Sequence, residues 1–454
     1  MSSLIRLAAV LACSLAIGVA DAEELQRRGM IGVQLAPLTA DLRTTLQFQG
    51  SGGVLISGII PGLPAEKAGL KSNDIITAVG ELPVDGPPAL SAALRPHGAG
   101  QTVSLSVWRE GATKILQLTL GERPRETSEK YDVTYDATRV GEHLVRTLVT
   151  RPKADGRRPA VLVLPGLPNQ PGEFPPQPRV PFRPLVEALS DAGFVTMRVD
   201  RPGVGDSQGV APEDAPISSD VATIAAAVAA LADYEFVDPK RVFVFAHGLA
   251  GTVLPLAMKD APVAGVIVYG TLARPPAEAL PELYARYAEL DAASDEDVQR
   301  TRKDARAFFA ALCEQCKSPV EVFKSEPALR ETIGPSVRDD TYLLERHYRF
   351  VQELSAAPIS ESWRSVRVPV LAMWGECDFQ AGRADHEQIV EWVNASHPGR
   401  AKLAVIEGAD HLFQSAEDAE ESYLSGFTGQ YNDAVFAAVC DWLKAQAGGA
   451  SQTP

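Results

Sequence analysis

A strand, a sharp turn and a helix follow one another over residues 241–258. The buried-strand residues 242–245 stop at the turn Ala-His-Gly-Leu-Ala-Gly, and an apolar helical pattern follows. Two side chains suited to proton transfer come after later strands, Asp378 in Gly-Glu-Cys-Asp and His411 in Gly-Ala-Asp-His. An imidazole whose tautomer is fixed by a carboxylate can take a proton from a hydroxyl or a water. The turn supplies no hydroxyl at its centre, because that residue is Gly248.

The elements around these residues alternate between strands and helices. Strands are predicted at 131–135, 144–149, 159–164, 193–199, 263–269, 368–374 and 401–406, and helices at 182–192, 220–231, 249–260 and 432–445. This alternation is typical of an α/β fold, in which helices cover both faces of a mostly parallel sheet. The strand pattern is absent between 271 and 367, where charged helical segments are predicted at 281–290, 297–313 and 340–354.

Residues 131–447 resemble the α/β-hydrolase superfamily, in a branch similar to exported bacterial esterases and peptidase-like serine hydrolases. The resemblance rests on the turn at 246–251, the loop DRPGVGDSQG at 200–209, and the loops that end in Asp378 and His411. Their chain order is the order of that family. The resemblance implies an α/β-hydrolase fold, with residues 271–367 as a helical cap over the carboxyl ends of the strands.

The same resemblance assigns roles to single residues. It implies that Gly248 occupies the nucleophile position, that Asp378 and His411 are the acid and the base, and that the N–H groups of Leu167 and Leu249 form the oxyanion hole. Gly248 has no side chain, so no acyl-enzyme can form there. Glycine also adopts the strained backbone angle of this turn without steric cost.

Two hypotheses follow from the missing nucleophile. The first is a binding protein, degenerate at the nucleophile, whose pocket receives a small ester, an acid or a peptide end. The second is an active hydrolase of carboxylic esters or peptides, in which Asp378 and His411 activate a water in the vacated space or a displaced nucleophile takes over. The candidates for a displaced nucleophile are weak: Thr252, Cys377 and Ser207.

Residues 28–122 predict a small β-rich domain, because short apolar runs alternate with Gly and Pro turns. The run PGLPAEKAGLKSNDII at 61–76 resembles PDZ domains of bacterial exported proteases. The resemblance implies a groove walled by a helix at 88–95, where the amides of Ile31, Gly32 and Val33 receive the C-terminal carboxylate of a peptide or protein. The alternative is a spacer or an internal clamp on the second domain. Polar residues predict a linker at 123–130, and residues 448–454 form a tail.

Residues 1–22 have the pattern of a secretory signal peptide. Arg6 precedes an apolar run at 7–19, and Ala-Asp-Ala ends at Ala22 as a cleavage site. The run is shorter than the ~20 residues of a spanning helix, so no transmembrane span is expected in the mature chain. Lipidation at Cys13 is the alternative to cleavage after Ala22. We therefore expect an exported protein, periplasmic or secreted.

The composition narrows the choice of partners. The 454 residues carry a net charge of −15, which argues against nucleic acid. The histidines show no metal-ligand spacing, and no second Cys or His pair completes a zinc site with Cys313 and Cys316. These two cysteines are expected to form a local disulfide or to remain free thiols. Neither a metal nor another cofactor is expected.

Overall fold

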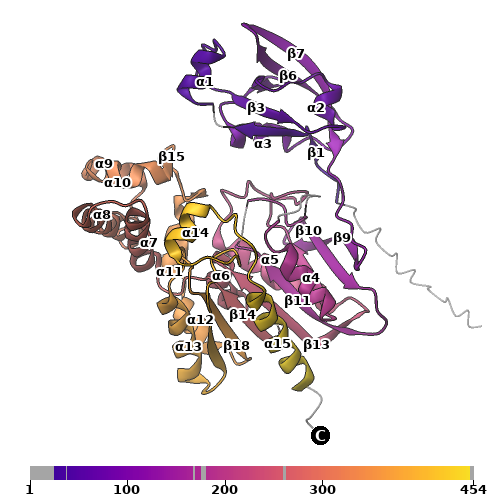
Figure 1. Cartoon of the computed structure of the whole chain (residues 1–454), viewed down its shortest axis with the longest axis vertical. Coiled ribbons are helices and arrows are strands. Elements are labelled where there is room, and N and C mark those ends of the chain that lie inside the picture. Colours follow the sequence, from indigo (N-terminus) through magenta and orange to yellow (C-terminus); the bar gives the residue numbers. More distant parts are fainter. Residues whose placement is uncertain (1–24, 37, 167–168, 175–179, 259–261, 450–454) are drawn as a thin grey trace, which may run out of the picture.

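The computed structural model describes residues 25–36, 38–166, 169–174, 180–258 and 262–449. It has two domains, a small one near the N-terminus and a larger one that contains the rest of the chain (Figure 1). The predicted signal peptide lies outside the described residues. Among the described helices, none is both long enough and apolar enough to cross a membrane.

The small domain is a curled sheet in the order β2-β3-β4-β6-β7, with β5 paired to β4. Its main core is an apolar cluster that includes Ile56, Ile76, Leu105 and Leu118, all fully buried, and a smaller cluster is formed by Phe48, Leu55 and Ile75. The two ends of the domain meet in the short pair β1–β8. Its elements are β1 (Gly29–Met30), β2 (Val33–Ala36), α1 (Ala40–Thr45), β3 (Val54–Ile59), α2 (Pro64–Lys67), β4 (Ile75–Val79), β5 (Leu82–Pro83), α3 (Pro87–Leu94), β6 (Thr102–Arg109), β7 (Ala112–Thr119) and β8 (Gly121–Glu122).

The large domain is built on an eight-stranded sheet in the order β19-β18-β14-β13-β11-β12-β10-β9. Strand β10 runs antiparallel to β9 and β12, and the other neighbours are parallel. The strands are β9 (Tyr131–Val140), β10 (His143–Pro152), β11 (Arg158–Leu164), β12 (Val195–Val199), β13 (Val237–His247), β14 (Gly265–Tyr269), β18 (Val370–Gly375) and β19 (Ala401–Ile406). Parallel strands end at the same edge, so the loops after β11, β13, β14, β18 and β19 meet there.

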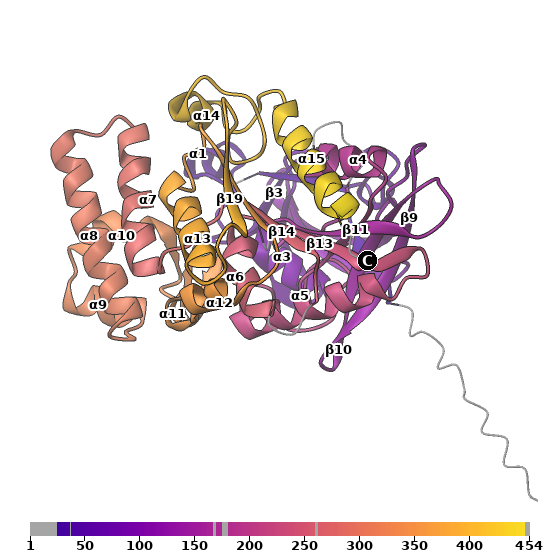
Figure 2. The ribbon, with the colours of Figure 1, turned by 90° about the horizontal axis from the view of Figure 1, so that it is seen from below.

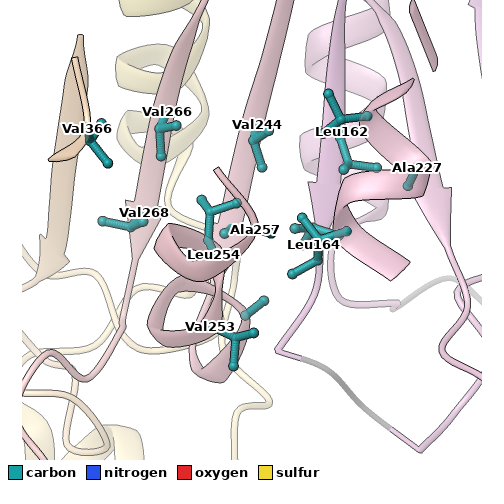
Figure 3. Close-up of a cluster of buried hydrophobic side chains, with 14 of the residues drawn as sticks. Leu162, Leu164, Ala227, Val244, Val253, Leu254, Ala257, Val266, Val268 and Val366 are labelled. Carbon is teal, nitrogen blue, oxygen red and sulfur yellow. The ribbon is translucent and has the colours of Figure 1, made fainter. Parts of the chain in front are cut away.

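Helices cover both faces of this sheet (Figure 2). Side chains of β11 and β13 alternate between two cores, so that Val244 packs on one face and Phe243 and Phe245 on the other. On the first face, Val253 and Leu254 of α6 pack against β13 and β14 (Figure 3). The helices are α5 (Ile217–Ala232), α6 (Leu249–Ala257), α12 (Ile359–Ser365) and α13 (Arg383–Ser396) on that face, and α4 (Arg183–Asp191) and α15 (Asp433–Gly449) on the other. The α/β fold expected from the alternating pattern is confirmed.

The cap has its own apolar core, formed by side chains that include Phe308, Phe309 and Leu312. The helix predicted at 340–354 is wrong in its first half, where the chain forms a three-stranded sheet. The positive φ angles of the pairs at 339–340 and 344–345 make tight turns that a helix cannot contain. The elements are α7 (Pro276–Leu290), α8 (Asp295–Cys313), α9 (Pro319–Ser325), α10 (Leu329–Ile333), β15 (Val337–Arg338), β16 (Tyr342–Leu343), β17 (Arg346–His347) and α11 (Tyr348–Ala356).

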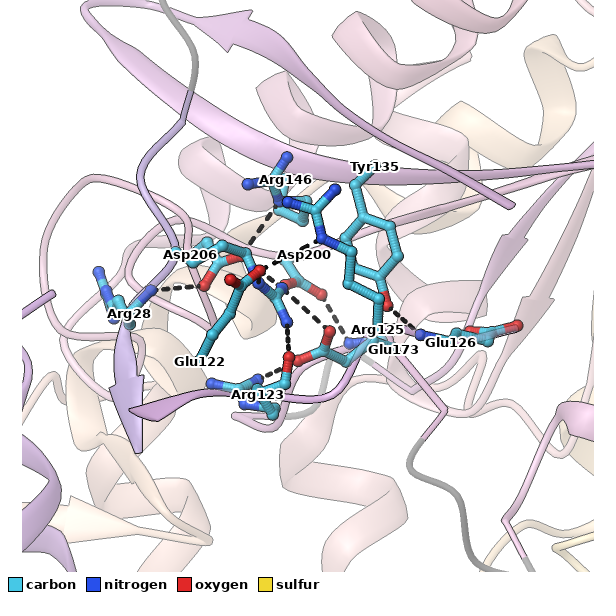
Figure 4. A network of polar contacts seen from close by, with 12 residues as sticks. Arg28, Glu122, Arg123, Arg125, Glu126, Tyr135, Arg146, Glu173, Asp200 and Asp206 are labelled. Atoms are coloured by element: carbon cyan, nitrogen blue, oxygen red, sulfur yellow. Dashed lines mark hydrogen bonds and ion pairs between the residues drawn. The ribbon is translucent and has the colours of Figure 1, made fainter. Parts of the chain in front are cut away.

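A buried polar network joins the two domains (Figure 4). Arg27, which precedes the small domain, pairs with Asp206 at 2.7 Å and with Glu173 at 3.0 Å. Asp206 also accepts the backbone N–H of Arg28 at 2.9 Å and lies 3.3 Å from the Arg146 guanidinium. Burial disfavours the charge of Arg27, but Glu173 and Asp206 more than offset this and raise its pKa above the usual value. The loop at 200–209 therefore binds Arg27 and Arg28, at the start of the small domain, through Asp206.

Residues 123–130, predicted as a linker, pack against the large domain and are called the connector below. Arg123 forms an ion pair with Glu173. Glu126 is buried and pairs at 2.9 Å with Arg198 of β12, which is also buried. The backbone N–H of Glu126 donates to the Tyr135 hydroxyl at 2.7 Å. The connector is therefore part of an ordered interface between the domains.

Asp206→Ala should destabilise this interface strongly. It leaves the buried guanidinium of Arg27 without its closest acceptor, and removing one partner of a buried pair costs about 3–5 kcal/mol. Urea unfolding should show this loss, and limited proteolysis should cleave the connector faster. The control is Asp191→Ala, which removes the exposed Lys130–Asp191 pair and should cost little, because water and salt screen an exposed ion pair. Equal losses in the two variants would contradict the assignment.

Candidate active site

The turn between β13 and α6 holds Gly248 in a conformation that other residues rarely adopt. Its φ is 53° and its ψ is −130°. Its N–H donates to the Tyr269 carbonyl at 2.9 Å, and its own carbonyl accepts the Thr271 hydroxyl at 2.7 Å. These contacts to the end of β14 fix the turn. A side chain at this position would add a strain of about 1–3 kcal/mol.

Asp378, after β18, and His411, after β19, lie next to each other at the same edge of the sheet. Asp378 Oδ2 is 2.9 Å from His411 Nδ1, and Asp378 Oδ1 accepts the N–H groups of Gln380 and Ala381 at 2.8 and 2.9 Å. Burial of Asp378 opposes its charge, but His411 and the two amides more than offset this and lower its pKa below the usual value. The carboxylate thus stays ionised and holds Nδ1 of His411 as the donor.

The Gly248 Cα faces the imidazole across an open space. A Cβ built there would lie 3.8 Å from His411 Nε2, 3.7 Å from the Gly166 Cα and 4.0 Å from the Gly270 carbonyl oxygen. These are ordinary van der Waals distances, so the position has room for a small side chain. A serine hydroxyl, one bond further out, could reach hydrogen-bonding distance of His411 Nε2. The structure therefore brings together Gly248, Asp378 and His411.

Two further residues that the sequence did not single out hold this arrangement. His247 Nε2 donates to the backbone carbonyl of His411 at 2.8 Å, and the two rings lie 4.4 Å apart. Burial, together with the neighbouring His411, lowers the pKa of His247 to about 3, so it stays neutral. The Tyr269 hydroxyl donates to the Asp410 carbonyl at 2.6 Å. In the sequence, only the position of His247 directly before Gly248 indicated that its side chain lies near the site.

The other candidate nucleophiles are engaged in structural contacts away from the turn. The Thr252 hydroxyl donates to the Leu272 carbonyl at 2.7 Å. The Cys377 thiol contacts the Ala416 carbonyl at 3.3 Å, and burial raises its pKa to about 11. Ser207 lies in the loop at 200–209, where its hydroxyl oxygen accepts the backbone N–H of Arg146 at 2.9 Å. None of the three shares the space at residue 248.

The predicted oxyanion donors are placed in part. Leu249 is the first residue of α6, so its N–H is one of the amides at the helix N-terminus that have no acceptor within the helix. A helix N-terminus favours a developing negative charge. Leu167 lies outside the described residues. Gly166, directly before it, lies beside Gly248.

The small domain places Ile31, Gly32 and Val33 at the start of its edge strand β2. Gly32 has a φ of 81°, and a Cβ there would lie 2.4 Å from the Leu63 Cβ, so only glycine fits. The carbonyls of Ile31 and Gly32 accept the N–H groups of Ala65 and Ile60, at 2.8 and 3.1 Å. Strand β2 pairs with β3 on one side, and within the described residues its other edge has no strand partner.

The described part of the chain contains neither a cluster of metal-ligand side chains nor a disulfide. No three His, Cys, Asp or Glu side chains gather there as a metal site would require. Cys313 and Cys316 are both free thiols, and burial raises the pKa of Cys313 to about 11. A thiol with so high a pKa is a poor nucleophile at neutral pH.

Residues 160–422, more than half of the chain, match the alpha/beta hydrolase family. The chain belongs to the alpha/beta hydrolase family. Residues 29–120 match the PDZ domain. The structure thus joins a PDZ domain (β1 to β7) to an alpha/beta hydrolase domain.

Curated relatives match only part of the chain. A probable periplasmic serine endoprotease, DegP-like, of Rhizobium meliloti is 34% identical over 139 residues, which are 29% of this chain and 27% of the relative. One of Chlamydia trachomatis is 35% identical over 99 residues, 22% of this chain and 20% of the relative. The chain therefore matches about a quarter or less of the length of these relatives.

Solved structures of esterases resemble the chain at low identity. Est1E from Butyrivibrio proteoclasticus, solved with ferulic acid bound, is 17% identical with a TM-score of 0.44, and the match covers 69% of this chain and 99% of that one. The Pyrococcus furiosus esterase Pf2001 is 13% identical with a TM-score of 0.40, over 71% and 96% of the two chains.

Gly270→Ala should disrupt the candidate site of the alpha/beta hydrolase domain. A Cβ at Gly270 would lie 2.8 Å from His411 Nδ1 and 3.0 Å from Asp378 Oδ2, and the φ of 58° favours glycine. We expect a larger fall in melting temperature than for Gly399→Ala, where φ is 77° but no atom lies within 4 Å. The difference between the two variants isolates the steric clash from the backbone strain. Equal melting temperatures would show that the pair adapts to a methyl group.

Proposed function

We propose that the protein is an exported PDZ-containing member of the alpha/beta hydrolase family whose hydrolase pocket binds an ester, an acid or a peptide end without acyl transfer. The observation that carries this proposal is Gly248, which stands at the nucleophile position while Asp378 and His411 keep their hydrogen bond. A site that keeps its polar groups and loses its hydroxyl can still hold a carbonyl or carboxylate oxygen.

The polar groups that remain suit such a ligand. His411 Nε2 faces the space at Gly248, and the Leu249 amide lies at the N-terminus of α6. The Leu249 amide can donate to an oxygen atom of the ligand. His411 Nε2, whose ring partner Nδ1 is held as the donor by Asp378, can accept a hydrogen bond from a protonated ligand oxygen. Covalent capture of the ligand is excluded at residue 248 because glycine has no nucleophilic atom.

A second candidate function is hydrolysis by an activated water. Within the described part of the chain His411 Nε2 makes no hydrogen bond, and the space left by the missing side chain lies directly before it. A water in that space would be in position to lose its proton to His411. In this candidate function, Asp378 and His411 form a general-base dyad that acts on carboxylic esters or peptides.

Export and peptide binding complete the proposal. The signal pattern of residues 1–22 supports export, and the names of the DegP-like relatives place those proteins in the periplasm. A PDZ domain suggests peptide binding. We assign to Ile31, Gly32 and Val33 the role of receiving the terminal carboxylate, because Gly32 turns the chain at the open edge of β2.

Gly248→Ser should restore a reactive nucleophile. We expect a fluorophosphonate probe to leave the unmodified protein unlabelled and to label the Gly248→Ser variant. Adding His411→Ala should slow labelling by about 10²–10⁴-fold, which is the usual contribution of a general base. Gly248→Ala is the matched control, because it adds the same backbone strain without a hydroxyl and should stay unlabelled.

The same proteins decide between the two candidate functions. Esterase activity of the unmodified protein on small activated esters that disappears in His411→Ala would overturn the binding role in favour of the water route. A Gly248→Ser variant that is folded but stays unlabelled would show that the pocket no longer supports acyl chemistry, and the roles assigned to Asp378 and His411 would fail.

The PDZ assignment predicts a preference for a free C-terminus. We expect fluorescein-labelled heptapeptides that end in valine, leucine or phenylalanine to bind the full chain at least tenfold more tightly as free acids than as amides. The carboxylate gains charge-assisted hydrogen bonds from the backbone amides, and each such bond contributes about 1.5–3 kcal/mol. Fluorescence polarisation measures both forms, and equal affinities would contradict the assignment.

A further inference from the structure

The peptide groove of the PDZ domain opens onto the hydrolase domain. A cleft of about 1010 Å³ lies between the two domains. The PDZ domain contributes residues 28–33 and side chains of α3, among them Leu90 and Leu94. The facing wall comes from the hydrolase domain, through the segment 169–171, the loop at 203–205 and cap residues that include Arg338 and Tyr342. The volume lies at the upper end of the ~300–1,000 Å³ range of small-molecule pockets, and the cleft runs along the open edge of β2, where an extended peptide can pair.

Positive charge gathers in the cleft that holds the carboxylate loop. Arg28, Arg95 and Arg123 line the cleft, and Arg28 lies three residues before Ile31. Burial, together with the charges of Arg95 and Arg123, lowers the pKa of Arg28 in spite of the nearby Asp206. Arg95 has only a distant acidic partner, Glu213, at 3.9 Å. The Arg28 guanidinium donates to the Gly203 and Ser207 carbonyls, and Arg123 pairs with Glu173. The charged residues that line the whole cleft are four arginines and two glutamates, so an anion entering it meets an excess of positive charge.

We propose that a peptide with a free C-terminus binds between the two domains, so that the hydrolase domain supplies the second wall of the PDZ site. The peptide extends β2 along its open edge, with its carboxylate at Gly32 and near the three arginines. Its upstream residues run beside the cap. This inference rests on the peptide-binding role proposed for the PDZ domain.

Contacts within the hydrolase wall show that it is built and held in place. The Arg338 guanidinium lies over the Tyr342 ring at 4.1 Å, and the Tyr342 hydroxyl donates to Asp214 at 3.1 Å. These contacts fix a planar aromatic surface on the cap side of the cleft. An aromatic ring that is already immobilised contacts a peptide at a low entropic cost.

Asn169 ties the wall of the cleft to the cap and to the loop at 200–209. Asn169 lines the cleft two residues after Leu167, at the predicted oxyanion loop. Its carbonyl oxygen accepts the Arg201 guanidinium at 2.8 Å, and its amide nitrogen donates to the Glu345 carbonyl of the cap at 3.4 Å. These two hydrogen bonds fix Asn169 in the hydrolase wall of the cleft.

The experiment measures binding of the labelled heptapeptides to the full chain and to two cap variants, Arg338→Glu and Tyr342→Ala. We expect each variant to weaken binding of the free acids by about tenfold, as when one aromatic or arginine contact in an interface is lost. Arg300→Glu is the matched charge control, because Arg300 also pairs with an aspartate on the cap surface but lies outside the cleft. Tyr423→Ala is the matched tyrosine control, since its hydroxyl also donates to an aspartate. Melting temperatures verify that every variant is folded.

The outcomes separate this inference from the function on which it rests. If free acids and amides bind the unmodified chain equally, or neither binds, the PDZ role fails and the inference fails with it. If the free acids bind preferentially and both cap variants match their controls, the PDZ role stands and the shared site is overturned. Weakening in the cap variants but not in the controls supports the shared site.

Discussion

The candidate site depends on one geometrical constraint, the common edge at which parallel strands end. Strands β11, β13, β14, β18 and β19 run in the same direction, so the loops that follow them converge although they are far apart in the chain. Gly248, Asp378 and His411 come from three of these loops. Gly270 has no side chain and so leaves room for the Asp378–His411 pair. The neutral His247 donates a hydrogen bond to the backbone carbonyl of His411. Each of these contacts joins loops that only the aligned strands of the sheet bring together.

Residue 248 has no side chain, but the residues around it form defined contacts. The backbone at residue 248 keeps a conformation that is strained for other residues, and the neighbouring imidazole keeps its carboxylate partner. The distances around a Cβ built at residue 248 are ordinary contact distances, so the turn has room for a small side chain beside His411 Nε2. The proposed binding role rests on this room and on the hydrogen bond between Asp378 and His411.

The buried ion pairs between the domains set the place of the PDZ groove. Arg27 and Arg28 are fixed on the loop that contains Asp206, and the connector is fixed through Glu126 and Arg198. Because both ends of the PDZ domain are held, its groove faces the cap at a defined distance. These contacts hold the PDZ domain against the hydrolase domain and so define the cleft between them. A peptide bound there would contact the PDZ domain on one side and the hydrolase domain on the other.

The sequence by itself determined the fold class, both domain types and the loops that carry Gly248, Asp378 and His411. Apolar periodicity and short glycine motifs are local signals, and they survive in a single sequence. The paired turns at 339–340 and 344–345 were missed because a charged segment with helical propensity carries no glycine to mark them. Residues 123–130 were predicted as a linker because they are polar, and a sequence does not show that Glu126 pairs with Arg198, 72 residues further on.

Only the tertiary structure decided the contacts between residues that are distant in the chain. The sequence could not show that Arg27 pairs with Asp206, that Gly270 must lack a side chain, or that the PDZ groove faces Tyr342. Each of these facts depends on the distance between two segments, and a sequence pattern records the environment of one segment only. The sequence therefore specified the candidate chemistry, and the packing of the two domains decided where a ligand can approach it.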